Sequence, residues 1–258
     1  MEWDREKLLR FLKSGIIVLS ALVLIACGVR FLPKVVETIS NQKKELPIYC
    51  VNTDKKQVAL SFDAAWGNDD TARILEILKK HNVNVTFFMT GGWVTKYPDD
   101  VKAIAAAGHD LGNHSENHKE MSKLSKEQCT EEIMSVHNKV KALTGISMEL
   151  FRAPYGDYNN TLIEAVRDNG YHCIQWDVDS LDWKDYGPDQ IVNRVVNNAH
   201  LGNGSIILCH NGAKYTADAL ETLILGLQEK GYEIVPISKL IYKENYTMDH
   251  EGRQFEEK

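Results

Sequence analysis

The sequence predicts an α/β domain built on a parallel sheet that curls into a barrel. Short apolar runs alternate with longer amphipathic segments along most of the chain. The apolar runs show little polar alternation, which is typical of strands covered on both faces. Because so many strand and helix units follow one another, we expect a closed or nearly closed barrel.

Each expected element follows from its local pattern. The expected strands are residues 57–62, 83–89, 109–113, 148–151, 172–176, 205–209 and 233–236. The expected helices are residues 71–80, 97–107, 125–143, 160–169, 188–199 and 217–230. The third helix has the clearest ends, because Ser125 and Gln128 form a capping-box pattern and Gly145 is a common stop.

Composition divides the chain into four regions. We expect a membrane segment with its cytoplasmic flank at 1–33, a stalk at 34–56, the folded domain at 57–242 and a loose charged tail at 243–258. The domain is long enough for one substantial core. A net charge of −6 without basic clusters argues against nucleic acid as a partner.

The N-terminal region reads as an export signal. An uncharged run from Ser14 to Val29 follows Arg5, Lys7 and Lys13, which predicts an N-terminus on the cytoplasmic side. Two interpretations stay open, a spanning helix or a lipobox ending at Cys27. Both place the domain outside the membrane and tethered to it.

The remaining cysteines carry no metal pattern. Cys50, Cys129, Cys173 and Cys209 could form disulfides in an exported protein, since their number is even. Their spacing matches no disulfide framework and contains no C-x-x-C pair. We therefore expect small buried thiols.

Five short motifs occur at or just after the ends of expected strands. They are Ser61-Phe62-Asp63, residues 114–118 (HSENH), residues 152–156 (RAPYG), residues 179–183 (DSLDW) and Leu208-Cys209-His210. The ends of parallel strands are where α/β active sites form. Their ordered set resembles the polysaccharide deacetylases with a NodB-type domain, carbohydrate esterase family four, including those of spore-forming Gram-positive bacteria. The resemblance implies a distorted barrel of about seven strands.

Two histidines are candidate metal ligands. His114 and His118 are four residues apart, so on a helical turn they would face the same way and share one ion. Neutral imidazole suits Zn, Co, Ni or Fe. The resemblance assigns one divalent metal to this pair.

The resemblance also implies the roles of the other site residues. Asp63 would be the general base, held by a bidentate contact with Arg152. His210 would be the general acid, aligned and kept charged by Asp182. The pocket residues would be Leu208 and Trp183, with the backbone N–H of Tyr155 as an oxyanion donor.

One position departs from the family pattern. The family places a second aspartate, its third metal ligand, directly after the base, whereas here Ala64 follows Asp63. Three alternatives stay open. Water or Asp63 fills the position, Asp69 or Asp70 reaches back from a position suited to helix capping, or the chain binds no metal and is a non-catalytic relative.

The implied function is hydrolytic removal of N-acetyl groups from amino sugars of a cell-surface polysaccharide. Location favours peptidoglycan, because the wall is the acetylated polymer beside the membrane. We expect a monomer whose partner is the glycan strand. The rival functions are a wall-glycan binding protein with an inactive site and a hydrolase of small amides on the same barrel.

Overall fold

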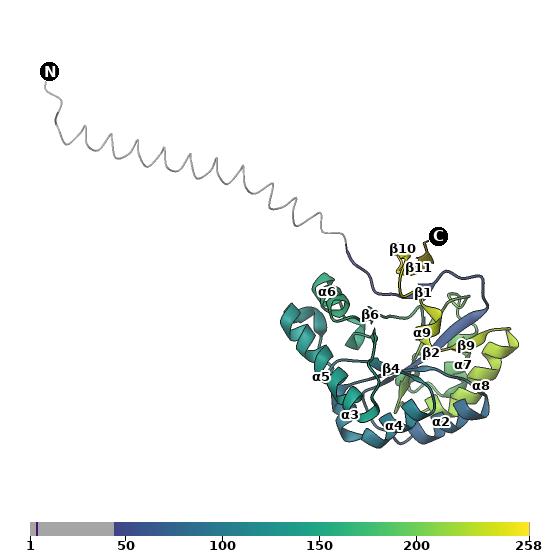
Figure 1. Ribbon diagram of the computed structural model, residues 1–258. Coiled ribbons are helices and arrows are strands. Elements are labelled where there is room, and N and C mark those ends of the chain that lie inside the picture. The colour runs from purple at the N-terminus through teal and green to yellow at the C-terminus, as the bar shows by residue number, and fades with distance from the viewer. Residues whose placement is uncertain (1–3, 5–43, 258) are drawn as a thin grey trace. The chain divides into compact units, whose positions relative to one another are not determined.

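The computed structural model describes Asp4 and residues 44–257. An eight-stranded parallel sheet forms the centre, with seven strands in the order β6-β5-β4-β3-β2-β8-β7 and β9 paired onto β2 (Figure 1). The strands are β2 (Gln57–Ala64), β3 (Thr86–Met89), β4 (Asp110–Asn113), β5 (Leu150–Phe151), β6 (His172–Cys173), β7 (Val178–Asp179), β8 (Ile206–Asn211) and β9 (Glu233–Val235). The expected distorted parallel barrel is confirmed, and it is open between β6 and β7.

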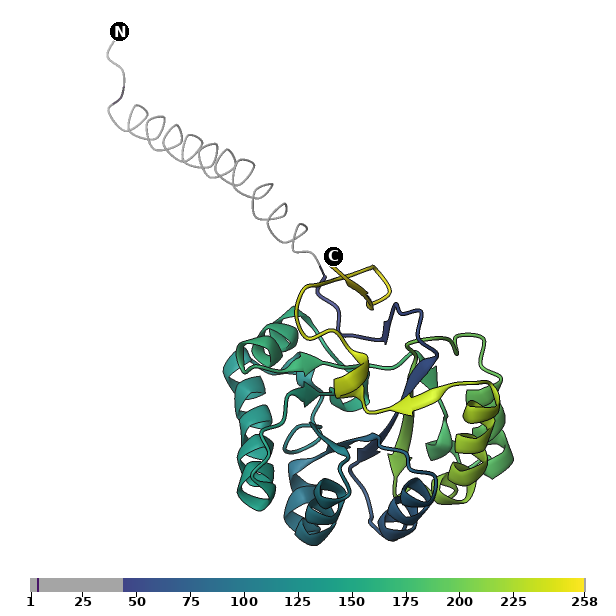
Figure 2. The ribbon, with the colours of Figure 1, turned by 45° about the vertical axis from the view of Figure 1, so that its right-hand side comes forward.

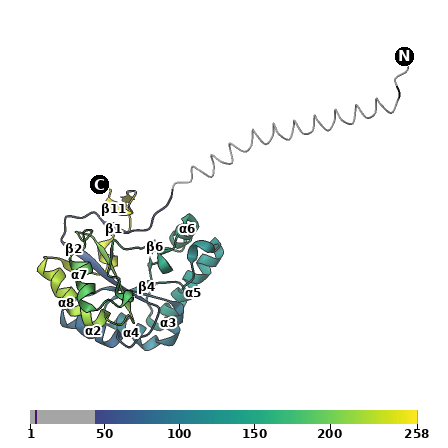
Figure 3. The same ribbon diagram turned by 180° about the vertical axis from the view of Figure 1, so that it is seen from behind.

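Helices cover the outside of the sheet, as the front and rear views show (Figures 1 and 3). They are α2 (Thr71–Lys80), α3 (Gly91–Lys96), α4 (Pro98–Ala106), α5 (Lys126–Thr144), α6 (Asn160–Asp168), α7 (Pro188–Val196), α8 (Thr216–Glu229) and α9 (Ile237–Leu240). The ends expected for α5 are confirmed. Ser125 and Gln128 make the reciprocal capping box, and Gly145 ends the helix with a left-handed φ of 76°.

Side chains of β2 alternate between two apolar layers. Leu60 and Phe62 point outward and pack with helix residues such as Leu78 and Leu220. Ala59 points inward and packs with residues of other strands, including Leu150. Burial on both faces explains why the strands read as continuous apolar runs.

The two ends of the domain differ from expectation. Residues 45–56 belong to the folded unit rather than to a stalk, since Ile48 is 2% exposed and β1 (Cys50–Val51) is paired. The C-terminal residues form β10 (Tyr246–Met248) and β11 (Arg253–Glu256), so they are not a loose tail. The strands β1, β11 and β10 make a second small sheet at the chain's C-terminal end (Figure 2).

Other local features differ from expectation. The expected helix 97–107 is confirmed as α4, which Pro98 starts after Tyr97 leaves the helical region, but the helix α3 before it was not expected. The short strand β7 and the helix α9 were not expected. Residues 114–118 form no helical turn, since Ser115 and His118 have positive φ values of 65° and 52°.

All four cysteines of the described region are free and buried, as expected. The predicted membrane segment and Cys27 lie outside the described residues. Across Asp4 and residues 44–257, no helix is both long enough and apolar enough to cross a membrane.

Candidate active site

The motifs meet at one cavity at the carboxyl ends of the strands. Asp63 on β2 and His210 on β8 are direct register partners in the parallel ladder. His114 follows β4 and Arg152 follows β5. The cavity has a volume of about 440 Å³, and the side chains that line it include Asp63, His114, His118, Tyr155 and His210.

A buried ion pair fixes the predicted base. Arg152 Nη1 donates to Asp63 Oδ1 at 2.8 Å, and Arg152 Nη2 donates to the Gln175 carbonyl at 3.2 Å. The contact is therefore single, and the expected bidentate contact was wrong. Burial alone would raise the pKa of Asp63, but the charges of Arg152, His114 and His210 hold this pKa below its usual value. Asp63 is therefore a carboxylate near neutral pH.

His114 and His118 lie together, although on a turn rather than a helix. Their ring centroids are 5.0 Å apart. His114 Nδ1 donates to the Arg152 carbonyl at 2.8 Å, which leaves Nε2 as a lone-pair donor 3.5 Å from Asp63 Oδ2. Burial lowers the pKa of both imidazoles, to about 4 for His114. Neutral rings with one nitrogen held by a carbonyl fit a divalent metal.

The third metal ligand is not supplied by the candidates on the following helix. Asp70 Oδ1 accepts from the Gly212 N–H at 2.9 Å and from the Asn211 side chain at 2.5 Å. Asp70 occupies the N-cap position of α2, as expected for one of the two aspartates, although its side chain makes no capping hydrogen bond. Asp69 is exposed, and neither carboxylate lines the cavity. Within the described part of the chain, no three His, Cys, Asp or Glu side chains are grouped to hold a metal.

Asp182 holds the predicted acid. His210 Nδ1 lies 2.7 Å from Asp182 Oδ1, and the His210 backbone N–H donates to Oδ2 at 2.6 Å. Thr216 Oγ1 donates to the same carboxylate at 2.6 Å. Burial would lower the pKa of His210, but the hydrogen bond and charge of Asp182 raise it above its usual value. The imidazolium is therefore favoured.

The predicted pocket residues line the cavity, together with residues that were not predicted. Leu208 is buried, while Trp183 is 48% and Tyr155 69% exposed. Tyr155 has a left-handed φ of 60°, an uncommon conformation for a large side chain that often marks functional sites. Sequence reasoning assigned no role to four further lining residues: Ala65, Trp66, Trp176 and Asp179. Trp66 and Asp179 could have been found, because they lie within or next to the motifs.

A parallel barrel with a carboxylate base, a charged histidine and a metal-compatible histidine pair at its strand ends defines a hydrolase-type site. A family model described as polysaccharide deacetylase matches residues 51–174. The chain is 32% identical to the peptidoglycan-N-acetylmuramic acid deacetylase PdaA of Bacillus subtilis, covering 78% of this chain and 77% of PdaA. The chain therefore belongs to the polysaccharide deacetylase family, a family of amide hydrolases.

Two other relatives complete the comparison. The chain is 35% identical to YlxY of Bacillus subtilis over 76% of its own length, but spans only 60% of YlxY. It also resembles the solved structure of BA3943 of Bacillus anthracis, described as a pseudoenzyme of carbohydrate esterase family four. The TM-score is 0.73 and the identity 35%, covering 77% of this chain and 69% of that one. A mutant of BA3943 is described as having restored enzymatic activity.

Proposed function

We propose that this protein is a metal-dependent N-deacetylase that acts on the amino sugars of peptidoglycan. One observation carries the proposal, the facing pair of Asp63 and His210 at one cavity, each held by its own charged partner. Amide hydrolysis needs a base for water and an acid for the leaving amine. The named relatives that act on peptidoglycan support the choice of polymer.

The reaction assigns one task to each residue. Asp63 accepts a proton from water as the water oxygen attacks the acetyl carbonyl carbon. The Tyr155 N–H donates to the oxyanion of the tetrahedral intermediate. His210 then gives its proton to the sugar nitrogen as the C–N bond breaks, which releases acetate and the free amine. Leu208 and Trp183 surround the acetyl methyl group.

A divalent metal would be held by His114 and His118, with Asp63 or water beside them. When bound, it would polarise the carbonyl and lower the pKa of water. Zn is the first candidate, with Co, Ni or Fe as others.

We propose that the enzyme acts as a monomer at the outer side of the cell membrane, to which residues 1–33 tether it. Mass spectrometry of membrane-extracted protein separates the two forms of tether. A lipidated Cys27 requires a mature chain without residues 1–26, whereas a spanning helix keeps Met1–Lys13. A soluble cytoplasmic pool with an intact N-terminus would contradict both.

A second function is favoured by Ala64. Because the family's third ligand is missing and BA3943 is described as a pseudoenzyme, this chain could instead bind wall glycan without hydrolysing it. The small-amide hydrolase is the remaining rival.

Metal content measured together with acetate release separates the three functions. The deacetylase should bind metal and release acetate from peptidoglycan fragments. The binding protein should release none, and the small-amide hydrolase should cleave small amides but not glycan. Absence of acetate release from glycan at any metal concentration would overturn the proposed function.

A further inference from the structure

Half-exposed aromatic rings gather around the cavity. In the described part of the chain, six large apolar or aromatic side chains are at least 40% exposed. Three of them, Trp66, Tyr155 and Trp183, line this cavity. Exposed apolar surface that is grouped in this way marks a binding site. None of the roles assigned above involves the Trp66 ring.

One face of Trp66 is already occupied. Its ring stacks on the His210 imidazole with the centroids 5.1 Å apart and the planes 20° apart. Nevertheless 48% of Trp66 remains exposed. The exposed surface therefore lies away from the face that stacks on His210, and the ring borders the same cavity.

The loop that carries Trp66, residues 65–68, is fixed on both sides. Trp93 Nε1 donates to the Gly67 carbonyl at 3.1 Å, and Asn68 Nδ2 donates to Asp100 Oδ2 at 2.7 Å. Gly212 packs so closely that a Cβ there would come within 3.0 Å of the Gly67 nitrogen. A fixed loop presents the ring in one place, which lowers the entropic cost of binding.

We propose that Trp66 forms a second sugar subsite, which binds the pyranose next to the one whose acetyl group faces His210. The inference rests on the proposed glycan substrate. A pyranose has an apolar C–H face that can pack on an indole, and large rings contribute strongly to such contacts. Trp66 thereby makes the protein selective for oligomers over single sugars.

Calorimetry of the full chain in detergent, with chelator to prevent turnover, tests the subsite. The ligands are N-acetylglucosamine and its β-1,4-linked tetramer. The parent should bind the tetramer at least about tenfold more tightly than the monosaccharide. Trp66→Leu should lose on the order of tenfold in tetramer affinity, with less than about a twofold change for the monosaccharide. Trp66→Phe, which keeps a flat ring, should retain most of the preference.

Tyr186→Leu is the matched control, because Tyr186 is 54% exposed but does not line the cavity. It should leave both dissociation constants unchanged. The subsite is refuted if the parent shows no preference for the tetramer, or if Trp66→Leu binds it as tightly as the parent. If Trp66→Leu loses tetramer binding while the parent releases no acetate, the subsite stands and the deacetylase proposal fails.

Discussion

His210 lies in surroundings unlike those of an ordinary surface histidine. Asp182 contacts both its ring and its backbone, and Thr216 contacts Asp182 in turn. The sequence shows only that His210 ends an apolar run and that Asp182 lies in a motif after another expected strand. The family resemblance therefore suggested the pairing of the two residues, but the sequence did not show its geometry. The structure adds Thr216, whose contact with Asp182 no sequence pattern indicated.

Asp182→Asn should lower the pKa of His210. The parent pKa is raised mainly by the hydrogen bond and charge of Asp182, against the effect of burial. Its protonated form therefore persists to higher pH than that of a free histidine, and the variant should lose it at lower pH. NMR titration of the His210 ring measures this directly, and the alkaline limb of the activity profile should move to lower pH.

Asp185→Asn is the control, since Asp185 is exposed and lies three residues after Asp182 in the sequence. Its His210 titration should match that of the parent. An unchanged His210 pKa in Asp182→Asn would show that the carboxylate does not stabilise the imidazolium.

Ala64→Asp should strengthen metal binding. Ala64 is fully buried at the end of β2 in the same apolar layer as Phe62, next to Asp63 and Ala65, which line the cavity, and the family resemblance places the third ligand at this position. A carboxylate there would add a charged ligand to the histidine pair, so we expect affinity for Zn or Co to rise on the order of tenfold or more. Competitive chelator titration of both proteins measures the change.

Ala64→Asn has nearly the same size without the charge, so it controls for disturbed packing. It should bind metal more weakly than Ala64→Asp. Equal affinity in the parent and Ala64→Asp would mean that another group, such as Asp63, already fills the third position.

At the scale of elements, patterned segments were predictable, including those that contain the short strands β5 and β6, whereas several short elements without a pattern were not. The α5 helix was placed within one residue because its capping box and terminal glycine act locally. The two-residue strands β1 and β7 carry too few residues for a periodic pattern. Similarly, β11 forms by pairing with β1 and with β10, and the contact between β1 and β11 joins the two ends of the folded domain in a way that composition does not reveal.

Gln254 connects the small sheet to the barrel and gives a test of this element. It is fully buried, its Nε2 donates to the Tyr242 carbonyl at 2.8 Å, and its Oε1 accepts from the Tyr242 N–H at 3.0 Å. Gln254→Ala leaves both backbone groups unpaired, which should cost about 1–3 kcal/mol of stability. Urea unfolding of the parent and the variant measures the loss.

Thr247→Ala in the neighbouring strand is the control, because Thr247 is exposed. It should change stability by less than about 0.5 kcal/mol. A Gln254→Ala variant as stable as the parent would show that the C-terminal strands contribute little to the domain.

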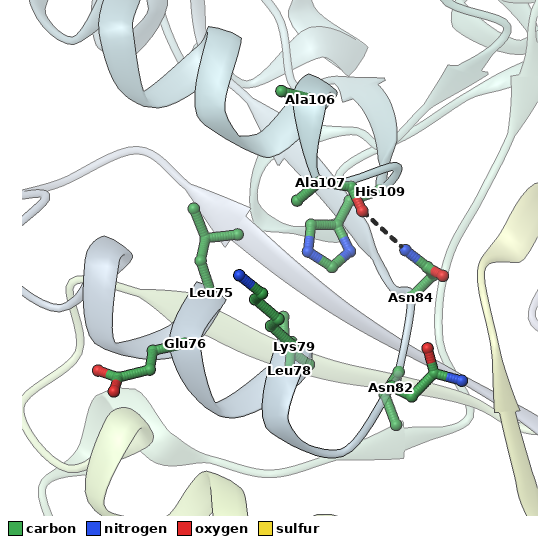
Figure 4. A pocket seen from close by; sticks show the side chains of 10 residues that line it. Leu75, Glu76, Leu78, Lys79, Asn82, Asn84, Ala106, Ala107 and His109 are labelled. Atoms are coloured by element: carbon green, nitrogen blue, oxygen red, sulfur yellow. Dashed lines mark hydrogen bonds between the residues drawn. The ribbon is translucent and has the colours of Figure 1, made fainter.

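At the scale of the whole molecule, buried histidines make the free energy of unfolding depend on pH. His109 lies in a groove between α2 and α4, where Asn84 donates to the Ala107 carbonyl at 3.1 Å (Figure 4). Burial lowers the pKa of His109 to about 4. The unfolded chain, with a histidine pKa near 6.5, therefore binds more protons than the folded chain between these two values.

The stabilisation from neutral His109 is thus present above about pH 6.5 and is lost as the pH falls toward about 4. The urea midpoint of chelator-treated protein should decrease from about pH 7 to about pH 5. His109→Gln should make this decrease smaller, since one titrating group is removed. A variant with the same pH dependence as the parent would exclude His109 as a source.

The whole barrel also explains which parts of the site could be predicted. Each of the five motifs was found at or just after the end of a strand, because parallel strands bring distant sequence positions to one rim. The turn at 114–118, the single Arg152 contact and the Trp66 ring depend on side-chain packing between strands. Such packing has no local sequence pattern, so these features needed the structure.

The most direct test of the proposed mechanism is acetate release from peptidoglycan fragments by the parent and by His210→Ala. Both proteins should be loaded with the same metal, and circular dichroism and metal content should confirm that folding and binding are unchanged. Removal of a general acid lowers the rate by about 10²–10⁴. We predict that His210→Ala retains its metal but loses acetate release to this extent. Near-normal acetate release by folded, metal-loaded His210→Ala would contradict the mechanism.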